Sequence, residues 1–201
     1  MPPTIAPYLL PGALVAFAGK HPGVEVVVHE DMTARLLKLA HDYEIDFALA
    51  SRPIADERME VRDLFAEELR VALPPGHPLP RKRTLSVSDL EGEKLIVMKE
   101  GHCLGDQVLD FCGRRDLRPN ISFRGAQLET VQALVCSGMG ISLIPEMATR
   151  SDRADLPEYR SLTPPRPQRK ITAFWPKQRQ MGRAADAFLR QIVEQVGKSR
   201  G

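Results

Sequence analysis

Along this chain, stretches whose hydrophobic residues have the pattern of a β-strand alternate with stretches whose hydrophobic residues have the spacing of an α-helix. "VEVVVHE" (24–30) is dominated by β-branched residues, which is typical of a β-strand. The next stretch, "MTARLLKLAHDYE" (32–44), spaces its leucines and Ala40 so that they form one apolar face of a helix. The alternation continues to the carboxyl end, and it predicts an α/β architecture with largely parallel sheets.

The remaining elements follow from the same two spacings. We expect helices over 8–19, 103–114, 128–138 and 182–197, and a short helix followed by a strand within 85–101. Further strands are expected over 45–51, 68–80, 120–126, 141–148 and 170–176, with the strand at 68–80 running into a Pro-rich turn. A loop is expected over 151–168.

Composition sets limits on the class of protein. A chain of 201 residues with 43% hydrophobic content can bury a core without a disulfide or a metal. The 28 basic and 26 acidic residues give a net charge of +2. So small a positive charge does not indicate a protein that binds nucleic acid through its whole surface. The local basic cluster "PRKRT" (80–84) is interpreted as a solvated loop.

Targeting and membrane signals are absent from the pattern. "YLLPGALVAFAG" (8–19) imitates a signal peptide but lacks a basic start and carries Pro11. No apolar run reaches the length of a membrane span, roughly 18 residues. Three cysteines are too few for a disulfide framework, so a reducing cytoplasm is the expected location.

Cys103 and Cys112 lie nine positions apart within the helix expected from 103. Nine residues of helix rise by about 13–14 Å and place the two side chains on opposite faces, whereas a disulfide needs Cα atoms roughly 4.4–6.8 Å apart. The two thiols therefore cannot join unless the helix unwinds. Either both are core residues or they form a redox switch whose two states differ in backbone. Cys136 is expected to pack in the core.

Other chemistry for these thiols finds less support. His102 and Cys103 offer two metal ligands, but no second cluster of ligands is present, so no metal or other cofactor is expected. A nucleophilic enzyme would also need a base and an oxyanion hole, which the pattern does not provide. We therefore expect that the chain is not an enzyme.

Several motifs resemble a known family. "HPGVEVVVHE" (21–30), "IDFALAS" (45–51) and "SGMGISLIP" (137–145) are similar to the effector-binding half of LysR-type bacterial transcription regulators. "GHCLGDQVLDFC" (101–112) resembles the cysteine motif of the OxyR-type peroxide sensors within that family. The likeness extends over nearly the whole chain.

The resemblance implies a fold of two α/β subdomains joined by two crossover segments, as in type 2 periplasmic binding proteins. Subdomain I would be 1–74 with 175–201, subdomain II would be 75–174, and the crossovers would lie near 73–76 and 172–176. The family's winged helix-turn-helix has no counterpart here, so contact with DNA is expected only through such a domain in an intact protein. A homodimer or tetramer is also implied.

The resemblance also assigns roles to residues. Cys103 would react with hydrogen peroxide and Cys112 would resolve it as a disulfide, which a thiol reductant would reset. The peroxide pocket would include Thr4, Thr33, His102, Asp106 and Arg169. Thr4 could equally be a helix N-cap, and for Thr33 the N-cap is the favoured interpretation.

One position departs from the OxyR-type pattern, because Gly105 stands where these sensors usually have arginine. Gly105 favours an alternative in which the domain binds a small organic anion and both cysteines are structural. A thiol peroxidase is the third hypothesis, distinguished by catalytic turnover with a recycling reductant.

Overall fold

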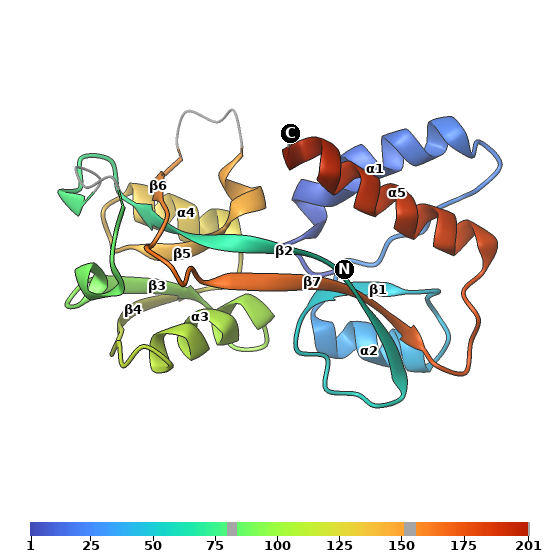
Figure 1. Cartoon of the computed structure of the whole chain (residues 1–201), viewed down its shortest axis with the longest axis horizontal. Helices are drawn as coiled ribbons and strands as arrows, with labels where there is room; N and C mark the ends of the chain where they lie inside the picture. Colours follow the sequence, from blue (N-terminus) through green and yellow to red (C-terminus); the bar gives the residue numbers. More distant parts are fainter. Residues whose placement is uncertain (80–83, 151–155, 201) are drawn as a thin grey trace. The chain divides into compact units, whose positions relative to one another are not determined.

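The structure is a computed structural model that describes residues 1–79, 84–150 and 156–200. The chain divides into two compact units, Met1–Ala66 with Lys170–Gly201 and Glu67–Arg169. Two long strands, β2 (Met59–Leu73) and β7 (Gln168–Pro176), each begin in one unit and end in the other (Figure 1). This is the α/β fold of two subdomains with two crossovers that the motifs imply.

Unit 1 is built around a pair of antiparallel strands with helices on both faces. β1 pairs with β7, and Ala48 lies opposite Phe174. Residues of the two strands alternate between two cores: Leu49 and Ala173 face one, whereas Phe174 faces the other. Its elements, besides the crossing strands, are α1 (Ala6–Lys20), α2 (Thr33–His41), β1 (Ala48–Ser51) and α5 (Arg183–Arg200).

The first of these cores joins α1 to α5, which lie side by side (Figure 1). Leu9, Ala13 and Phe17 are buried at four-residue intervals, so they form one stripe of α1. The Phe17 ring meets the Phe188 ring of α5 edge-on at 4.9 Å between centroids. Each large apolar side chain buried in this way stabilises the fold by about 1.5–3 kcal/mol.

Unit 2 contains the predicted cysteine helix. β3 and β4 run parallel, and β5 continues beside β3 through a bridge between Leu95 and Ile141. β2 pairs antiparallel with both β5 and β6. The elements are η2 (Val87–Leu90), β3 (Lys94–Met98), α3 (Cys103–Gly113), β4 (Asn120–Gly125), α4 (Leu128–Cys136), β5 (Ser142–Pro145), η3 (Glu146–Thr149) and β6 (Glu158–Arg160).

Most predicted elements are confirmed, with shifted ends. The helices expected over 8–19, 32–44, 103–114, 128–138 and 182–197 are α1 to α5. The expected strands over 45–51, 120–126, 141–148 and 170–176 correspond to β1, β4, β5 and β7. The segment 85–101 contains the short helix η2 and the strand β3.

Four expectations were wrong. The segment 24–30 is not a strand, although it has the composition of one, and its Val27 is 74% exposed. The sheets are not largely parallel: β3–β4 is parallel, but the ladders of β1 with β7 and of β2 with β5 and β6 are antiparallel. β2 begins at Met59 rather than near 68, and β6 lies in a stretch expected to be loop.

The division between the units falls earlier in the chain than the sequence indicated. The structure separates the units after Ala66 and after Arg169, whereas the predicted boundaries were 74/75 and 174/175. The sequence prediction placed the first crossover at the Pro-rich turn, but the chain passes between units inside β2 itself. Most of the basic cluster 80–84 lies outside the described residues.

Candidate functional site

The connection from β3 to α3 places Cys103. The Lys99 N–H donates to the Gly125 carbonyl at 2.8 Å, which extends the β3–β4 ladder by one residue. Gly101 then turns the chain with a φ of 88°, a conformation that glycine adopts without strain. Because β3 and β4 are parallel, their carboxyl ends meet at one edge of the sheet, and α3 and α4 both begin there. Ligand sites of α/β proteins commonly lie at this edge.

Cys103 is the first residue of α3, as the sequence predicted. Its thiol is free and half-buried. The unpaired N–H groups and the dipole at a helix N-terminus stabilise an anion, and a thiolate is the reactive form of cysteine. The position therefore suits a thiol that must react with a small oxidant.

His102 is the N-cap residue of α3 and is 6% exposed. Burial lowers the pKa of His102, the nearby positive charge of Lys99 lowers it further, and Asp106 partly opposes them. The imidazole is therefore neutral at pH 7. Its Nε2 is buried and has no hydrogen-bond partner among the described residues. A neutral, unpaired ring nitrogen beside Cys103 in the chain can accept a proton.

Cys112 lies on the inner face of α3. It is 1% exposed, and burial raises its pKa, so the residue is held as a thiol. Leu104 and Val108 share this face at four-residue intervals and are also buried. In an intact helix the rise of about 13–14 Å over nine residues keeps Cys112 out of bonding reach of Cys103. Both thiols are free.

Gly105 has a packing role that the sequence did not reveal. A Cβ added to Gly105 would lie 2.6 Å from the carbonyl oxygen of Met98, at the end of β3. The glycine therefore lets the first turn of α3 approach the strand closely. Any side chain at this position would require the helix or the end of β3 to move. Asp106, predicted for the pocket, is exposed one residue further along.

Arg169 is completely buried and is paired with an acidic residue that the sequence analysis missed. Its Nε donates to Glu67 Oε1 at 2.7 Å, and the two side chains are 0% and 2% exposed. The second oxygen of Glu67 accepts a hydrogen bond from the Met147 N–H at 2.9 Å. These two residues stand where β2 enters and β7 leaves unit 2. The pattern of hydrophobic and polar residues along β2 did not indicate that Glu67 is buried, because a glutamate in a strand is normally read as an exposed position.

The two threonines predicted for the pocket belong to unit 1. Neither is an N-cap: Ile5 caps α1 and Met32 caps α2, so Thr33 is the first residue of its helix. Thr4 is 1% exposed. The Thr33 Oγ1 is buried without a hydrogen-bond partner among the described residues. Their part in a pocket stays a prediction.

Cys136 was expected to pack in the core. Cys136 closes α4 and is half-buried rather than part of the core. Within the described residues, no cluster of three His, Cys, Asp or Glu side chains is arranged to hold a metal ion. The helices of the described part are all too short or too polar to cross a membrane.

Comparisons with known proteins identify the family to which this chain is similar. Residues 1–197 match the LysR substrate binding domain family. A probable hydrogen peroxide-inducible genes activator of Mycobacterium avium is 36% identical over 174 residues, covering 84% of this chain and 55% of that protein. The chain therefore spans about 55% of the length of this curated relative.

Solved structures are similar over nearly the whole chain. The reduced OxyR regulatory domain from Pseudomonas aeruginosa has a TM-score of 0.84 and 26% identity, covering 96% of this chain and 94% of that one. An oxidised form of OxyR has a TM-score of 0.82 and 27% identity, covering 98% of this chain and 93% of that one.

Proposed function

The chain belongs to the LysR substrate-binding domain family, and from this membership we propose that it is the regulatory domain of an OxyR-like transcription regulator that senses hydrogen peroxide. The observation that carries the proposal is the placement of Cys103. Cys103 is half-buried at the first residue of α3, and a second thiol lies in the same helix. The domain regulates transcription and is not an enzyme.

The chemistry uses one peroxide and two thiols. The Cys103 thiolate attacks one peroxide oxygen, an S–O bond forms, the O–O bond breaks, and hydroxide leaves and is protonated to water. The Cys112 sulfur then attacks the Cys103 sulfenic acid, which forms the disulfide and releases a second water. A dithiol reductant of the cell would restore both thiols. His102 is the group that takes the Cys103 proton, because its imidazole is neutral and its Nε2 is unpaired among the described residues.

The second step forces a change of backbone. Cys112 must leave the inner face of α3, and the burial of Leu104 and Val108 is lost with it. Each of these side chains contributes about 1.5–3 kcal/mol when buried. The disulfide therefore forms only in a state with different packing of unit 2. That difference gives the oxidised domain a surface distinct from that of the reduced one.

The partners follow from this coupling. We expect the altered surface to change the geometry of a homodimer or tetramer. In an intact regulator, such a change would reposition DNA-binding domains joined to this one. Hydrogen peroxide is the signal and a thiol reductant resets it.

Mass spectrometry after one equivalent of peroxide tests the proposal. The Cys136→Ser variant serves as the background, because it removes the third thiol, which lies in α4, and leaves the sequence of α3 unchanged. In this background we expect a peptide that links Cys103 to Cys112. The Cys112→Ser variant should instead accumulate a sulfenic acid at Cys103 that dimedone traps.

The Cys103→Ser variant provides the opposite outcome. In the Cys136→Ser background it should consume no peroxide and form no disulfide, since Cys112 is buried and its pKa is raised. Equal peroxide consumption by Cys103→Ser and the parent would refute the assignment of Cys103. Repeated turnover with a reductant at enzymatic rates would instead favour a thiol peroxidase.

A second candidate function is the binding of a small organic anion, with structural cysteines. Gly105 favours it, because the guanidinium of the OxyR-type sensors is missing and the glycine is packed against Met98. A thermal-shift screen of carboxylates separates the two candidates. A ligand-dependent rise in Tm, with no reaction of Cys103 with peroxide, would support the anion.

A further inference from the structure

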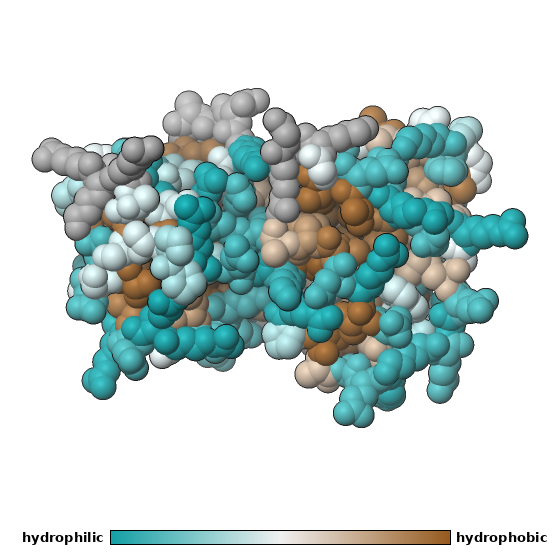
Figure 2. Space-filling model, viewed as in Figure 1, coloured by the Kyte–Doolittle hydropathy of each residue, from teal (hydrophilic) through white to brown (hydrophobic). Residues whose placement is uncertain are grey.

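The two ends of α3 are held differently, and this decides where the helix can open. At the amino end, Gly105 lies so close to the carbonyl oxygen of Met98 that an added Cβ would be 2.6 Å from it. At the carboxyl end, a Cβ added to Gly113 meets nothing within 4 Å, and residues 114–116 are exposed. Hydrophilic side chains project from the lower edge of unit 2, where α3 lies (Figure 1, Figure 2). The carboxyl end can therefore open with less loss of packing.

The carbonyl of Cys112 is the centre of the turn that closes α3. It accepts hydrogen bonds from the Arg115 N–H at 3.1 Å and from the Leu117 N–H at 3.0 Å. Leu117 is 6% exposed, so it anchors the far end of the turn in unit 2.

Disulfide formation must open this turn. The Cα atoms of Cys103 and Cys112 lie about 13–14 Å apart in an intact helix and at most roughly 6.8 Å apart in a disulfide, so Cys112 must travel about 7 Å relative to Cys103. The five residues that lead to Leu117 can span about 17 Å when extended, so they can supply this travel while Leu117 stays buried. Both hydrogen bonds to the Cys112 carbonyl then break.

Arg115 ties the turn to a distant segment of unit 2. Its Nη2 donates to the Pro165 carbonyl at 3.1 Å, and its Cζ lies 5.9 Å from the centre of the Phe111 ring. The segment that follows Pro165 is fixed to β2, because the Leu69 N–H donates to the Pro167 carbonyl at 2.8 Å. Arg115 therefore links a turn that must open to a segment that is anchored elsewhere.

Asp116 acts in the opposite direction. Its φ is 54°, in the left-handed region that glycine adopts more readily than aspartate. This backbone strain exists only while the turn is closed. Opening the turn therefore relieves the strain at Asp116 at the same time as it breaks the contacts of Arg115.

We propose that the turn 113–117 is the hinge of the redox change and that Arg115 is the latch that holds the reduced state. This inference rests on the proposed disulfide between Cys103 and Cys112. A contact made in only one of two states shifts the equilibrium toward that state. The latch therefore favours the reduced domain, whereas the strain at Asp116 favours the oxidised one. Together they set the ratio of oxidant to reductant at which the disulfide forms, and Arg115 is a positioning residue that acts through the turn.

Equilibration with dithiothreitol tests the proposal on the whole chain in the Cys136→Ser background. Oxidised dithiothreitol takes two electrons and two protons from the two cysteines as the bond between Cys103 and Cys112 forms. The linked fraction is measured by mass spectrometry after alkylation of the free thiols. The quantity compared is the ratio of oxidised to reduced dithiothreitol at which half of the protein is linked.

The variants are Arg115→Ala and Asp116→Gly, each with a matched control. Arg118→Ala removes the same charge from an exposed residue that follows the turn. Asp116→Asn removes the charge of Asp116 but keeps a residue with comparable tolerance of a positive φ.

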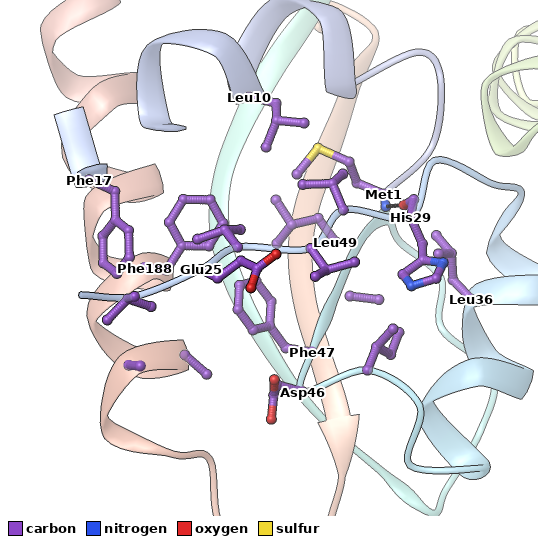
Figure 3. Close-up of a pocket in the computed structure, with 18 of the residues that line it drawn as sticks. Met1, Leu10, Phe17, Glu25, His29, Leu36, Asp46, Phe47, Leu49 and Phe188 are labelled. Carbon is purple, nitrogen blue, oxygen red and sulfur yellow. Dashed lines mark hydrogen bonds between the residues drawn. The ribbon is translucent and has the colours of Figure 1, made fainter. Parts of the chain in front are cut away.

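A control for folding comes from unit 1. Leu10, Phe17 and Phe188 line a groove of about 430 Å³ there, and all of its lining residues belong to unit 1 (Figure 3). Their NMR chemical shifts should be the same in every variant, because no residue of the turn 113–117 lines the groove.

The two variants should shift the equilibrium in opposite directions. Arg115→Ala should reach half linkage at a ratio at least about threefold lower than the background, because the reduced state loses the latch. Asp116→Gly should need a ratio at least about twofold higher, and higher than Asp116→Asn, because glycine relieves the strain of the closed turn. Arg118→Ala should match the background.

Two results would overturn the latch while leaving the disulfide in place. One is a shift in Arg115→Ala no larger than that in Arg118→Ala, and the other is a shift of Arg115→Ala and Asp116→Gly in the same direction. If the background protein forms no link at any ratio, the proposed function fails and this inference fails with it.

Discussion

Gly105 allows a close approach between α3 and the end of β3, and replacing it with alanine should loosen the candidate redox helix. The added Cβ would lie 2.6 Å from the carbonyl oxygen of Met98, which is backbone and cannot rotate away. The first turn of α3 must therefore shift. Overpacking of this kind typically costs about 1–3 kcal/mol.

Gly113 of the same helix is a matched control. A Cβ added there meets nothing within 4 Å. Replacing glycine by alanine in a helix gains up to about 1 kcal/mol through helix propensity, and this gain is common to both positions. The difference in the free energy of unfolding between Gly105→Ala and Gly113→Ala therefore isolates the contact with Met98. We expect Gly105→Ala to be the less stable by about 1–3 kcal/mol.

Urea unfolding followed by far-ultraviolet circular dichroism measures this difference. Thermal unfolding should show it as well, at roughly 2–4 °C for each kcal/mol in a chain of this size. If Gly105→Ala is as stable as Gly113→Ala, α3 does not lie against β3 as described, and the packing argument for Gly105 fails.

Three further predictions concern the buried charges and thiols. Glu67→Gln removes the carboxylate that faces the buried Arg169 charge and should lower the free energy of unfolding by about 3–5 kcal/mol. Arg169→Met should restore part of this loss in the double variant, and urea unfolding of the cycle measures it. The pKa of His102 is lower in the folded chain than its ordinary 6.5, so the unfolded state binds more protons and the stability should fall as the pH drops below about 6.5. When Tm is followed between pH 8 and 5, the fall of Tm with decreasing pH should be smaller in His102→Gln than in the parent. Under native conditions iodoacetamide should label Cys103 well before Cys112, which is buried and has a raised pKa; labelling of both at one rate, measured by mass spectrometry, would contradict the assigned burial.

The sequence predicted those helices and strands in which buried residues recur at a regular spacing. α3 is an example, because Leu104, Val108 and Cys112 recur at helical spacing and all are buried. The segment 24–30 shows the limit of such a pattern. Its valines favour a strand, but a strand also needs a partner, and the described chain provides one only at Met1.

Contacts between residues far apart in sequence were beyond this reasoning. Glu67 and Arg169 are brought together only by the two crossing strands, and neither position carries a signal for the other. The role of Gly105 depends likewise on where Met98 ends β3. The two thiols could be placed on one helix from the sequence, because helical spacing is a pattern of neighbouring residues. The residues that pack around the thiols could not be predicted, because they come from distant parts of the sequence.

The central claim is that Cys103 and Cys112 cannot join while α3 is intact. Hydrogen exchange measured by mass spectrometry on the reduced and the peroxide-treated domain tests it directly, with the disulfide confirmed in the same sample. We predict that peptides covering 103–113 are protected in the reduced domain and exchange rapidly once the two sulfurs are linked. A linked pair in a helix that keeps its full protection would contradict the account.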